Sequence, residues 1–247
     1  MIKKVTKYFV FIGLVAGLLV LYSFTKKRNQ RKVVDAIAVE FNEGSNPFLT
    51  HESVNKLLIQ SQVTVKNQPK SILDLHHLEN RVASNPYVEK ARVFITLGGV
   101  LKTHITQKEP IARIISDNEV YYIDKEGAKI PLSSSFSARV PIINGDNLSE
   151  KLQEITQLVL FISKDQFLQK EVTGIQILNT NEYVFTVRSG NYRVEFGKYE
   201  DVNLKFKKLK AFYNKAIKDK TIKKYKTINL KYHNQVVCTK ENQDGEQ

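Results

Sequence analysis

The sequence predicts an α+β protein with three parts in order: one transmembrane helix, a strand–helix–helix–strand–strand unit, and a mixed β-rich domain that holds two helices. A charge-free apolar run, helically spaced apolar residues between alternating strands, and mostly β-type alternation from Ile111 onwards predict these parts. The expected boundaries are a short tail at 1–7, the transmembrane helix at 8–25, a basic juxtamembrane segment at 26–33, the first unit at 34–110, the β-domain at 111–240 and a disordered tail at 241–247.

The apolar run, Tyr8–Phe24, lies between two groups of basic residues and predicts an uncleaved membrane anchor. As a helix it would rise about 26 Å, close to the ~30 Å hydrocarbon core of a bilayer. A cleaved secretory signal would need a small-residue exit where bulky Phe24 stands, and a lipoprotein signal would need Cys where Leu18 stands. Counting Lys and Arg would place the large domain in the cytoplasm, but both flanks are positive, so charge alone leaves the orientation open.

Residues 34–110 are expected to form the strand–helix–helix–strand–strand unit. Asp74 is the expected N-cap of the second helix, Asn85-Pro86 ends that helix, and Gly98-Gly99 forms a tight turn between the last two strands. The expected elements are a strand at 34–41, a short helix from Thr50 to Leu58, a helix from Asp74 to Asn85, and strands at 91–97 and 101–105.

Residues 111–240 are expected to be mainly strands with two amphipathic helices. The turn Asp124–Gly127 predicts a hairpin, and Asp201 is the expected N-cap of the second helix. The expected strands are 121–123, 128–131, 140–143, 172–178, 183–188, 192–196, 227–232 and 235–239, and the expected helices are 149–163 and 202–216.

The net charge of +13 is concentrated in residues 1–32 and 198–231, the second of which holds twelve lysines against three acids. The lysine-rich segment is open to three interpretations: the solvated outer face of a helix, contact with an anionic membrane or acidic polymer, or nucleic-acid binding. Its normal apolar pattern favours the first, and the absence of an aromatic-interleaved basic groove disfavours the last. The lone Cys238 excludes an intrachain disulfide and a cysteine-rich metal site.

The sequence contains no pattern that is typical of catalysis or metal binding. His76 and His77 are adjacent and point to different faces of their helix, which is poor spacing for shared ligation. Motifs of serine hydrolases, zinc proteases and phosphate-binding loops do not occur. Asp124 and Glu126 lie on the expected hairpin, where turn chemistry accounts for Asp124. We therefore expect no catalytic residue, metal, cofactor or small-molecule substrate.

Several short motifs, in their order behind the apolar run, resemble the FtsQ/DivIB family of bacterial cell-division proteins. Tyr87, Gln107 and Asn229 depart from the family pattern, which usually has Trp, an acid and Asp at these places. The motifs are Asn85-Pro86-Tyr87-Val88 with Ala91-Arg92-Val93, Gly99-Val100-Leu101, Lys108-Glu109-Pro110-Ile111-Ala112, the hairpin 122–127, Val140-Pro141 with Gly145, the segment 190–197, and Ile228-Asn229-Leu230-Lys231-Tyr232.

This resemblance implies a POTRA domain at 34–110, a β-domain at 111–240, and a non-enzymatic divisome scaffold that links early and late division proteins. It also implies a single-pass protein of the inner membrane at the division septum, with the amino terminus in the cytoplasm and the bulk in the periplasm. The partners it implies are the single-pass proteins FtsB and FtsL and, through them, the enzymes of septal wall synthesis.

The resemblance further implies that the last strands of the β-domain offer a free edge to FtsB, which an incoming strand can complete. Tyr232 is the first candidate contact, and Asn234, Gln235, Val236 and Val237 would form the pairing strand, with alternate residues facing the partner. Tyr232 as a packed strand aromatic is the structural alternative. A membrane-tethered enzyme of cell-wall glycan and a POTRA-bearing secretion accessory are the alternative functions.

Overall fold

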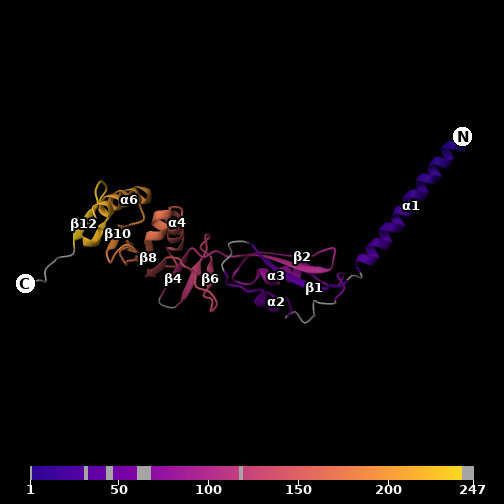
Figure 1. Cartoon of the computed structure of the whole chain (residues 1–247), viewed down its shortest axis with the longest axis horizontal. Helices are drawn as coiled ribbons and strands as arrows, with labels where there is room; N and C mark the ends of the chain where they lie inside the picture. The colour runs from indigo at the N-terminus through magenta and orange to yellow at the C-terminus, as the bar shows by residue number, and fades with distance from the viewer. Residues whose placement is uncertain (1, 31–32, 43–46, 60–67, 117–118, 241–247) are drawn as a thin grey trace, which may run out of the picture. The chain divides into compact units, whose positions relative to one another are not determined.

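The computed structural model describes residues 2–30, 33–42, 47–59, 68–116 and 119–240, with side chains of the first helix described from Phe11 to Arg28. The chain divides into two compact units, Met1–Gln107 and Lys108–Gln247 (Figure 1). The predicted disordered tail at 241–247 lies outside the described residues.

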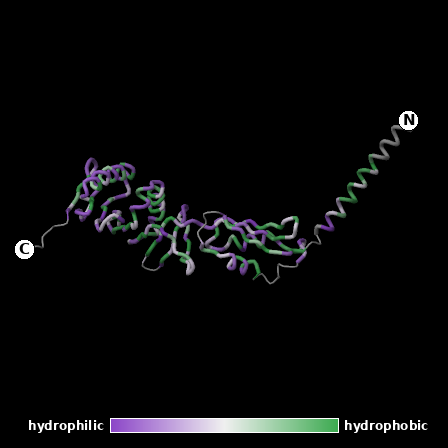
Figure 2. Tube along the Cα trace, viewed as in Figure 1, coloured by the Kyte–Doolittle hydropathy of each residue, from purple (hydrophilic) through white to green (hydrophobic). Residues whose placement is uncertain are grey.

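Helix α1 (Ile2–Gln30) contains the apolar run, and Figure 2 shows its apolar stretch ending at a hydrophilic segment. Within the described residues, no helix combines the length and the apolar character needed to cross a membrane. The transmembrane helix predicted at 8–25 is therefore wrong.

The rest of the first unit has the predicted order of elements. They are β1 (Ala36–Phe41), α2 (His51–Ile59), α3 (Leu75–Ala83), β2 (Val88–Ile95) and β3 (Val100–Gln107). The strands form a sheet of order β1-β3-β2, in which β1 is parallel and β2 antiparallel to β3. The Asp74 carboxylate caps α3 as predicted, because its Oδ1 accepts a hydrogen bond of 2.9 Å from the His77 amide.

The helices of the first unit cover one face of its sheet. Apolar side chains of α2 and α3 pack with those of the strands into one core, which leaves the other sheet face open. The core members on the helices are Val54, Leu58, Leu78 and Val82, and those on the strands are Val39, Val88, Val93, Leu101 and Ile105. The alternation of each strand therefore separates a buried face from a face that carries polar side chains.

A glutamate from α3 lies at the outer edge of β2. The Glu79 carboxylate accepts a hydrogen bond of 2.8 Å from the backbone amide of Val93. In the turn that follows this strand, the Lys70 ammonium donates to the carbonyl of Thr96 at 2.8 Å. The Glu79 carboxylate thus takes up a backbone group that an edge strand would otherwise offer to another strand.

The second unit contains one sheet of order β12-β11-β10-β9-β8-β7-β4-β5-β6. The strands are β4 (Ala112–Ile115), β5 (Val120–Ile123), β6 (Lys129–Pro131), β7 (Ile142–Gly145), β8 (Val172–Ile177), β9 (Tyr183–Val187), β10 (Arg193–Gly197), β11 (Tyr225–Asn229) and β12 (Val237–Lys240). The helices are α4 (Leu152–Ser163), α5 (Gln166–Glu171), α6 (Val202–Lys218) and a 3-10 turn at Ile222–Lys224. The α+β class is confirmed, with a β-rich second part.

The short helix α5 was not among the predicted elements. Asp165 caps it, because its carboxylate accepts hydrogen bonds from the amides of Phe167 and Leu168 at 3.0 and 3.1 Å. A single helical turn and a half is too short for a 3.6-residue period to show in the sequence. The only local signal was therefore the capping Asp165.

A buried carboxylate lies at the end of α5. Glu171 is 7% exposed and accepts hydrogen bonds from the hydroxyl groups of Ser189 and Tyr213, the second at 3.0 Å. The Tyr192 hydroxyl donates to the Tyr213 hydroxyl at 2.8 Å. Burial raises the pKa of both phenols, so Tyr213 remains a neutral donor to Glu171 and Tyr192 a neutral donor to Tyr213. These contacts join α5, the β9–β10 turn and α6 in the interior of the second unit.

Candidate partner-binding edge

Strand β12 is the outer strand at one end of the nine-stranded sheet, and it lies near the carboxyl end of the chain (Figure 1). It pairs antiparallel with β11, in a register that sets Val237 opposite Asn229 and Thr239 opposite Thr227. Strand β11 in turn pairs parallel with β10. Among the described residues, no strand pairs with the outer side of β12.

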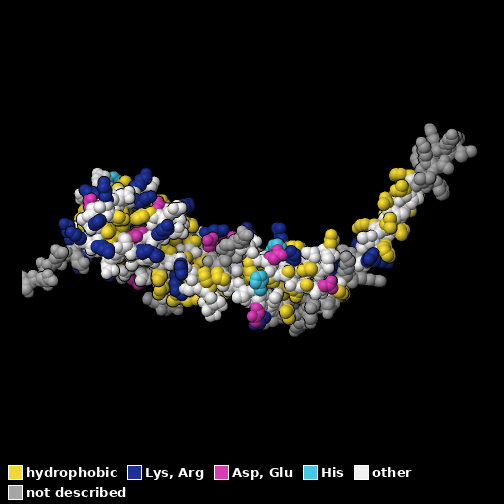
Figure 3. Space-filling view, in the orientation of Figure 1, with side chains coloured by type: hydrophobic (Ala, Val, Ile, Leu, Met, Phe, Trp, Pro, Cys, Tyr) yellow, Lys and Arg dark blue, Asp and Glu magenta, His cyan; other side chains and the backbone are white. Residues whose placement is uncertain are grey.

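Helix α6 connects β10 to the last two strands and covers the buried face of this end of the sheet. Phe206, Leu209 and Tyr213 enter the core, whereas many of its lysines lie on the surface of the unit (Figure 3). Lys205 departs from the predicted solvated face, since it is only 4% exposed and donates to the Lys198 carbonyl at 2.8 Å. Burial lowers the pKa of Lys205, and its ammonium lies 4.8 Å from the centre of the Phe196 ring.

The chain turns sharply after β11. The Leu230 amide donates to the Glu195 carbonyl at 2.9 Å, and the Lys231 amide donates to the Asn229 side chain at 2.9 Å. Lys231 Nζ lies 3.2 Å from the Glu182 carboxylate and 3.7 Å from that of Glu195. These two carboxylates, Glu182 first, raise the pKa of Lys231. The turn is thereby tied to β9 and β10 through side chains on the open face of the sheet.

Lys208 holds the segment that follows the turn. Its ammonium donates to the carbonyl of Leu230 at 3.1 Å and also to the carbonyl of Tyr232. Partial burial lowers the pKa of Lys208. A lysine at a helix position is usually a solvated side chain, so the sequence carried no signal for this role. The contact spans 24 residues and depends on how α6 packs against the sheet.

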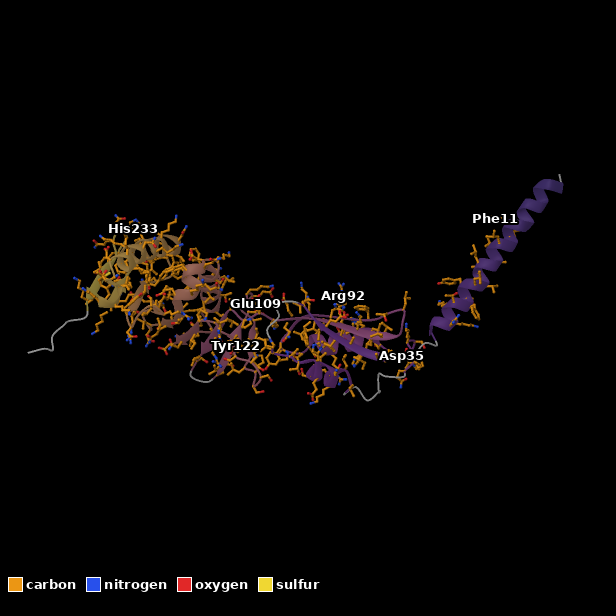
Figure 4. The ribbon with its side chains drawn as sticks, in the orientation of Figure 1. Phe11, Asp35, Arg92, Glu109, Tyr122 and His233 are labelled. Carbon is orange, nitrogen blue, oxygen red and sulfur yellow. The ribbon has the colours of Figure 1, made fainter. Side chains whose placement is uncertain are left out.

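The five predicted contact residues lie in two different environments. Tyr232 is 50% exposed, and Asn234 and Gln235 are also exposed. Val236 is partly buried and packs against the core, whereas Val237 is the first residue of β12 and is 39% exposed. The strand expected at 235–239 thus begins two residues later, and only Val237 of the five belongs to it. Figure 4 shows His233 in the connecting segment, at the surface of the unit.

The alternation of β12 separates its side chains into two faces. Cys238 packs against the core beside Val236, and burial raises the pKa of its thiol. Val237 and Thr239 lie on the opposite face and are exposed. Val237 and Thr239 are therefore the exposed side chains of the strand that forms this end of the sheet.

The Asp124 carboxylate has a role in a hairpin turn. Asp124 Oδ1 accepts hydrogen bonds from the amides of Glu126 and Ala128, each at 2.9 Å, as expected for an aspartate that shapes a hairpin. Within the described part of the chain, no group of three His, Cys, Asp or Glu side chains is placed to hold a metal ion.

Comparison with known families assigns both units. Residues 109–239 match the family described as FtsQ/DivIB, C-terminal related, and residues 36–106 match the POTRA-like domain. A search of curated proteins found no match to this chain. The first match contains the whole predicted contact segment and covers more than half of the chain, which confirms the resemblance found in the sequence. The protein therefore belongs to the FtsQ/DivIB, C-terminal related family.

Proposed function

We propose that this protein is a non-enzymatic scaffold of the bacterial cell-division machinery that works at the division septum. In this proposal it links early and late division proteins and binds FtsB/FtsL-like partners through the outer edge of β12. That contact would regulate the enzymes of septal wall synthesis. The family match over 109–239 and the POTRA-like match over 36–106 support the scaffold role.

The observation that carries the binding mode is the unpaired outer side of β12, in a part of the chain that matches the family. Backbone N–H and C=O groups on such an edge supply affinity to an added strand, and the flanking side chains supply specificity. Val237 on β12 and Tyr232 in the segment that precedes this strand are exposed and would contact the added strand. Asn234 and Gln235 would supply polar contacts, while Val236 would act by holding the strand against the core.

A depletion experiment tests the scaffold role. Cells depleted of the protein are expected to grow as filaments, and a fluorescent fusion of the full chain is expected to gather at midcell. The number of septa per cell length, measured by membrane staining, is the readout. Uniform distribution of the fusion together with normal septation would refute the proposal.

Site-specific photocrosslinking tests the binding edge. A photoreactive amino acid at Tyr232 or Val237 is expected to give crosslinks to an FtsB-like protein in cells, identified by mass spectrometry. The matched control is Asn214, which is exposed on α6 in the same unit. Crosslinks of equal yield from Asn214, or none from Tyr232 and Val237, would place the contact elsewhere.

A further inference from the structure

The open face of the sheet in the first unit carries an ordered array of polar side chains. The register sets Glu40 of β1 beside His104 of β3, and His104 beside Arg92 of β2. Two residues farther along β3, Thr106 pairs with Lys90 of β2, and two residues earlier on β3, Lys102 pairs with Phe94. Because residues in register share a face, these side chains all stand on the side away from α2 and α3.

The single carboxylate of this array is already neutralised. Glu40 lies 2.7 Å from the Lys102 ammonium and 3.0 Å from His104 Nε2. The hydrogen bond from Lys102, followed by the charges of Lys102 and His104, lowers the pKa of Glu40. Lys90 and Arg92 are exposed and form no ion pair with another described residue. The face therefore has two cationic side chains whose charge is available to a ligand.

These cationic side chains border a hollow of about 540 Å³, which is within the usual size range of ligand sites. The hollow is lined by Asn42, Lys90, Ala91, Arg92, Phe94, His104 and Thr106. The rings of Phe94 and His104 stack with their centres 5.3 Å apart and form a flat aromatic surface within it. Figure 4 shows Arg92 projecting from the sheet, clear of the ribbon.

The neighbouring edge of β2 is a less suitable place for a ligand to add. The Glu79 carboxylate already accepts the hydrogen bond of the Val93 amide there. A strand that paired with β2 would have to displace this side chain. The charged groups of Lys90 and Arg92 instead lie on the open face of the sheet. A ligand that binds both of them therefore lies across this face.

We propose that this face binds an acidic peptide segment of a partner protein, in an extended conformation over β2. Lys90 and Arg92 are two positions apart on one strand, and carboxylates at i and i+2 of an extended peptide recur at the same interval of about 6.6–7 Å. A residue at i+4 of that peptide then reaches Phe94. The favoured sequence is acid–x–acid–x–aromatic, with the Arg92 guanidinium forming a bidentate pair with one carboxylate.

This ligand suits the face better than a lipid surface does. A bilayer presents a broad plane of charge, whereas here two cations border a hollow with an aromatic floor. The spacing of the cations along one strand also matches an extended peptide. The site lies in the first unit and is separate from the β12 edge, so either assignment can fail without the other.

Fluorescence anisotropy with the full-length chain tests the proposal. The probe is a labelled peptide, Gly-Glu-Ser-Glu-Ser-Phe-Gly, compared with the same peptide carrying Gln for both Glu. The double variant Lys90→Gln/Arg92→Gln is expected to raise the Kd at least about tenfold, because charge-assisted hydrogen bonds are lost. The Gln peptide is expected to bind as weakly to the unchanged protein.

Lys56→Gln is the matched control, since Lys56 is an exposed lysine on α2 of the same unit. It is expected to leave the Kd unchanged, as is Val237→Asp in the second unit. Equal weakening by Lys56→Gln, or equal binding of the Gln peptide, would overturn the site. Tighter binding of phosphatidylglycerol vesicles or inorganic phosphate than of the peptide, lost in the double variant, would overturn the peptide assignment.

Discussion

A glutamate carboxylate of each unit accepts hydrogen bonds from a neighbouring strand or turn, Glu79 in the first unit and Glu171 in the second. The two carboxylates differ in how deeply they are buried. Glu79 of the first unit lies at the outer edge of β2 and accepts from the Val93 amide. Glu171 of the second unit lies in the interior, where it accepts from Ser189 and Tyr213. No described side chain of the second unit hydrogen-bonds to the backbone of β12 in a comparable way. The first sheet is thus closed at β2, whereas the second remains open to pairing at β12.

Replacing Glu171 is expected to have the largest effect. Glu171→Ala leaves the buried hydroxyl of Tyr213 and the Ser189 hydroxyl without their acceptor, and should lower the free energy of unfolding by about 3 kcal/mol. Urea unfolding followed by circular dichroism measures this loss. Hydrogen exchange resolved by peptide should show the loss confined to the second unit.

Glu171→Gln keeps an acceptor and is expected to lose less stability than Glu171→Ala. Glu150→Ala, at an exposed position of the same unit, is the control and should remain within about 0.5 kcal/mol of the unchanged protein. If Glu171→Ala behaves like Glu150→Ala, the carboxylate does not hold the interior together.

Opening the closed edge should produce the second-largest effect. Glu79→Ala removes the acceptor of the Val93 amide and should destabilise the first unit by about 1.5–2 kcal/mol. It also frees an edge strand, so self-association is expected to rise with concentration, as measured by light scattering after size-exclusion chromatography.

The control for this variant is Glu52→Ala, which removes an equally charged side chain from the exposed pair with Lys56 on α2. It should change neither stability nor association appreciably. A monomeric Glu79→Ala variant of unchanged stability would contradict the idea that Glu79 closes the edge.

Lys208 tests whether the open edge is prearranged for a partner. Lys208→Met keeps the aliphatic stem but removes the hydrogen bonds to the carbonyls of Leu230 and Tyr232, at a cost of about 1 kcal/mol. Amide hydrogen exchange over residues 231–236 should become faster, and crosslinking from Tyr232 should weaken. Lys207→Met, its exposed neighbour, should leave both measurements unchanged.

The smallest expected effect concerns Asp165, the cap of the helix that carries Glu171. The hydrogen bond from Lys210, and then those from the amides of Leu168 and Phe167, lower the pKa of Asp165. Its stabilisation is therefore complete above the ordinary pKa of about 3.9 and is lost as the pH falls through the lower folded pKa. Asp165→Asn should be less stable by about 0.5 kcal/mol at pH 7 and equal to the unchanged protein at the acid end.

Denaturant unfolding of both proteins between pH 7 and pH 2.5 measures this convergence. Asp146→Asn, at an exposed loop position, is the control and should show no such pH-dependent difference. If the stability difference between Asp165→Asn and the unchanged protein grew as the pH fell, the assigned direction of the Asp165 pKa shift would be wrong.

The order of elements in the first unit followed from the sequence, because strand alternation and the cap at Asp74 are local signals, whereas β4 and α5 of the second unit were missed. The contacts that make the β2 edge different from the β12 edge could not be predicted from the sequence. Glu79 reaches the Val93 amide only after α3 packs on the sheet. Lys205 and Lys208 were expected to be solvated, because their hydrogen bonds to backbone carbonyls likewise form only when α6 packs on the sheet. The last strand was expected from Gln235, but it begins two residues later at Val237. The apolar run gave a helix, but not the membrane span that its composition indicated.

The single cysteine gives this molecule a built-in probe of its open edge. Cys238 points inward from β12, with a thiol whose pKa burial has raised, so a maleimide or disulfide reagent reacts slowly while the strand is in place. Each transient detachment of β12 exposes the thiol, and the labelling rate therefore counts these openings. A partner that adds a strand to the sheet would suppress them, which makes thiol labelling a readout of binding that needs no introduced label.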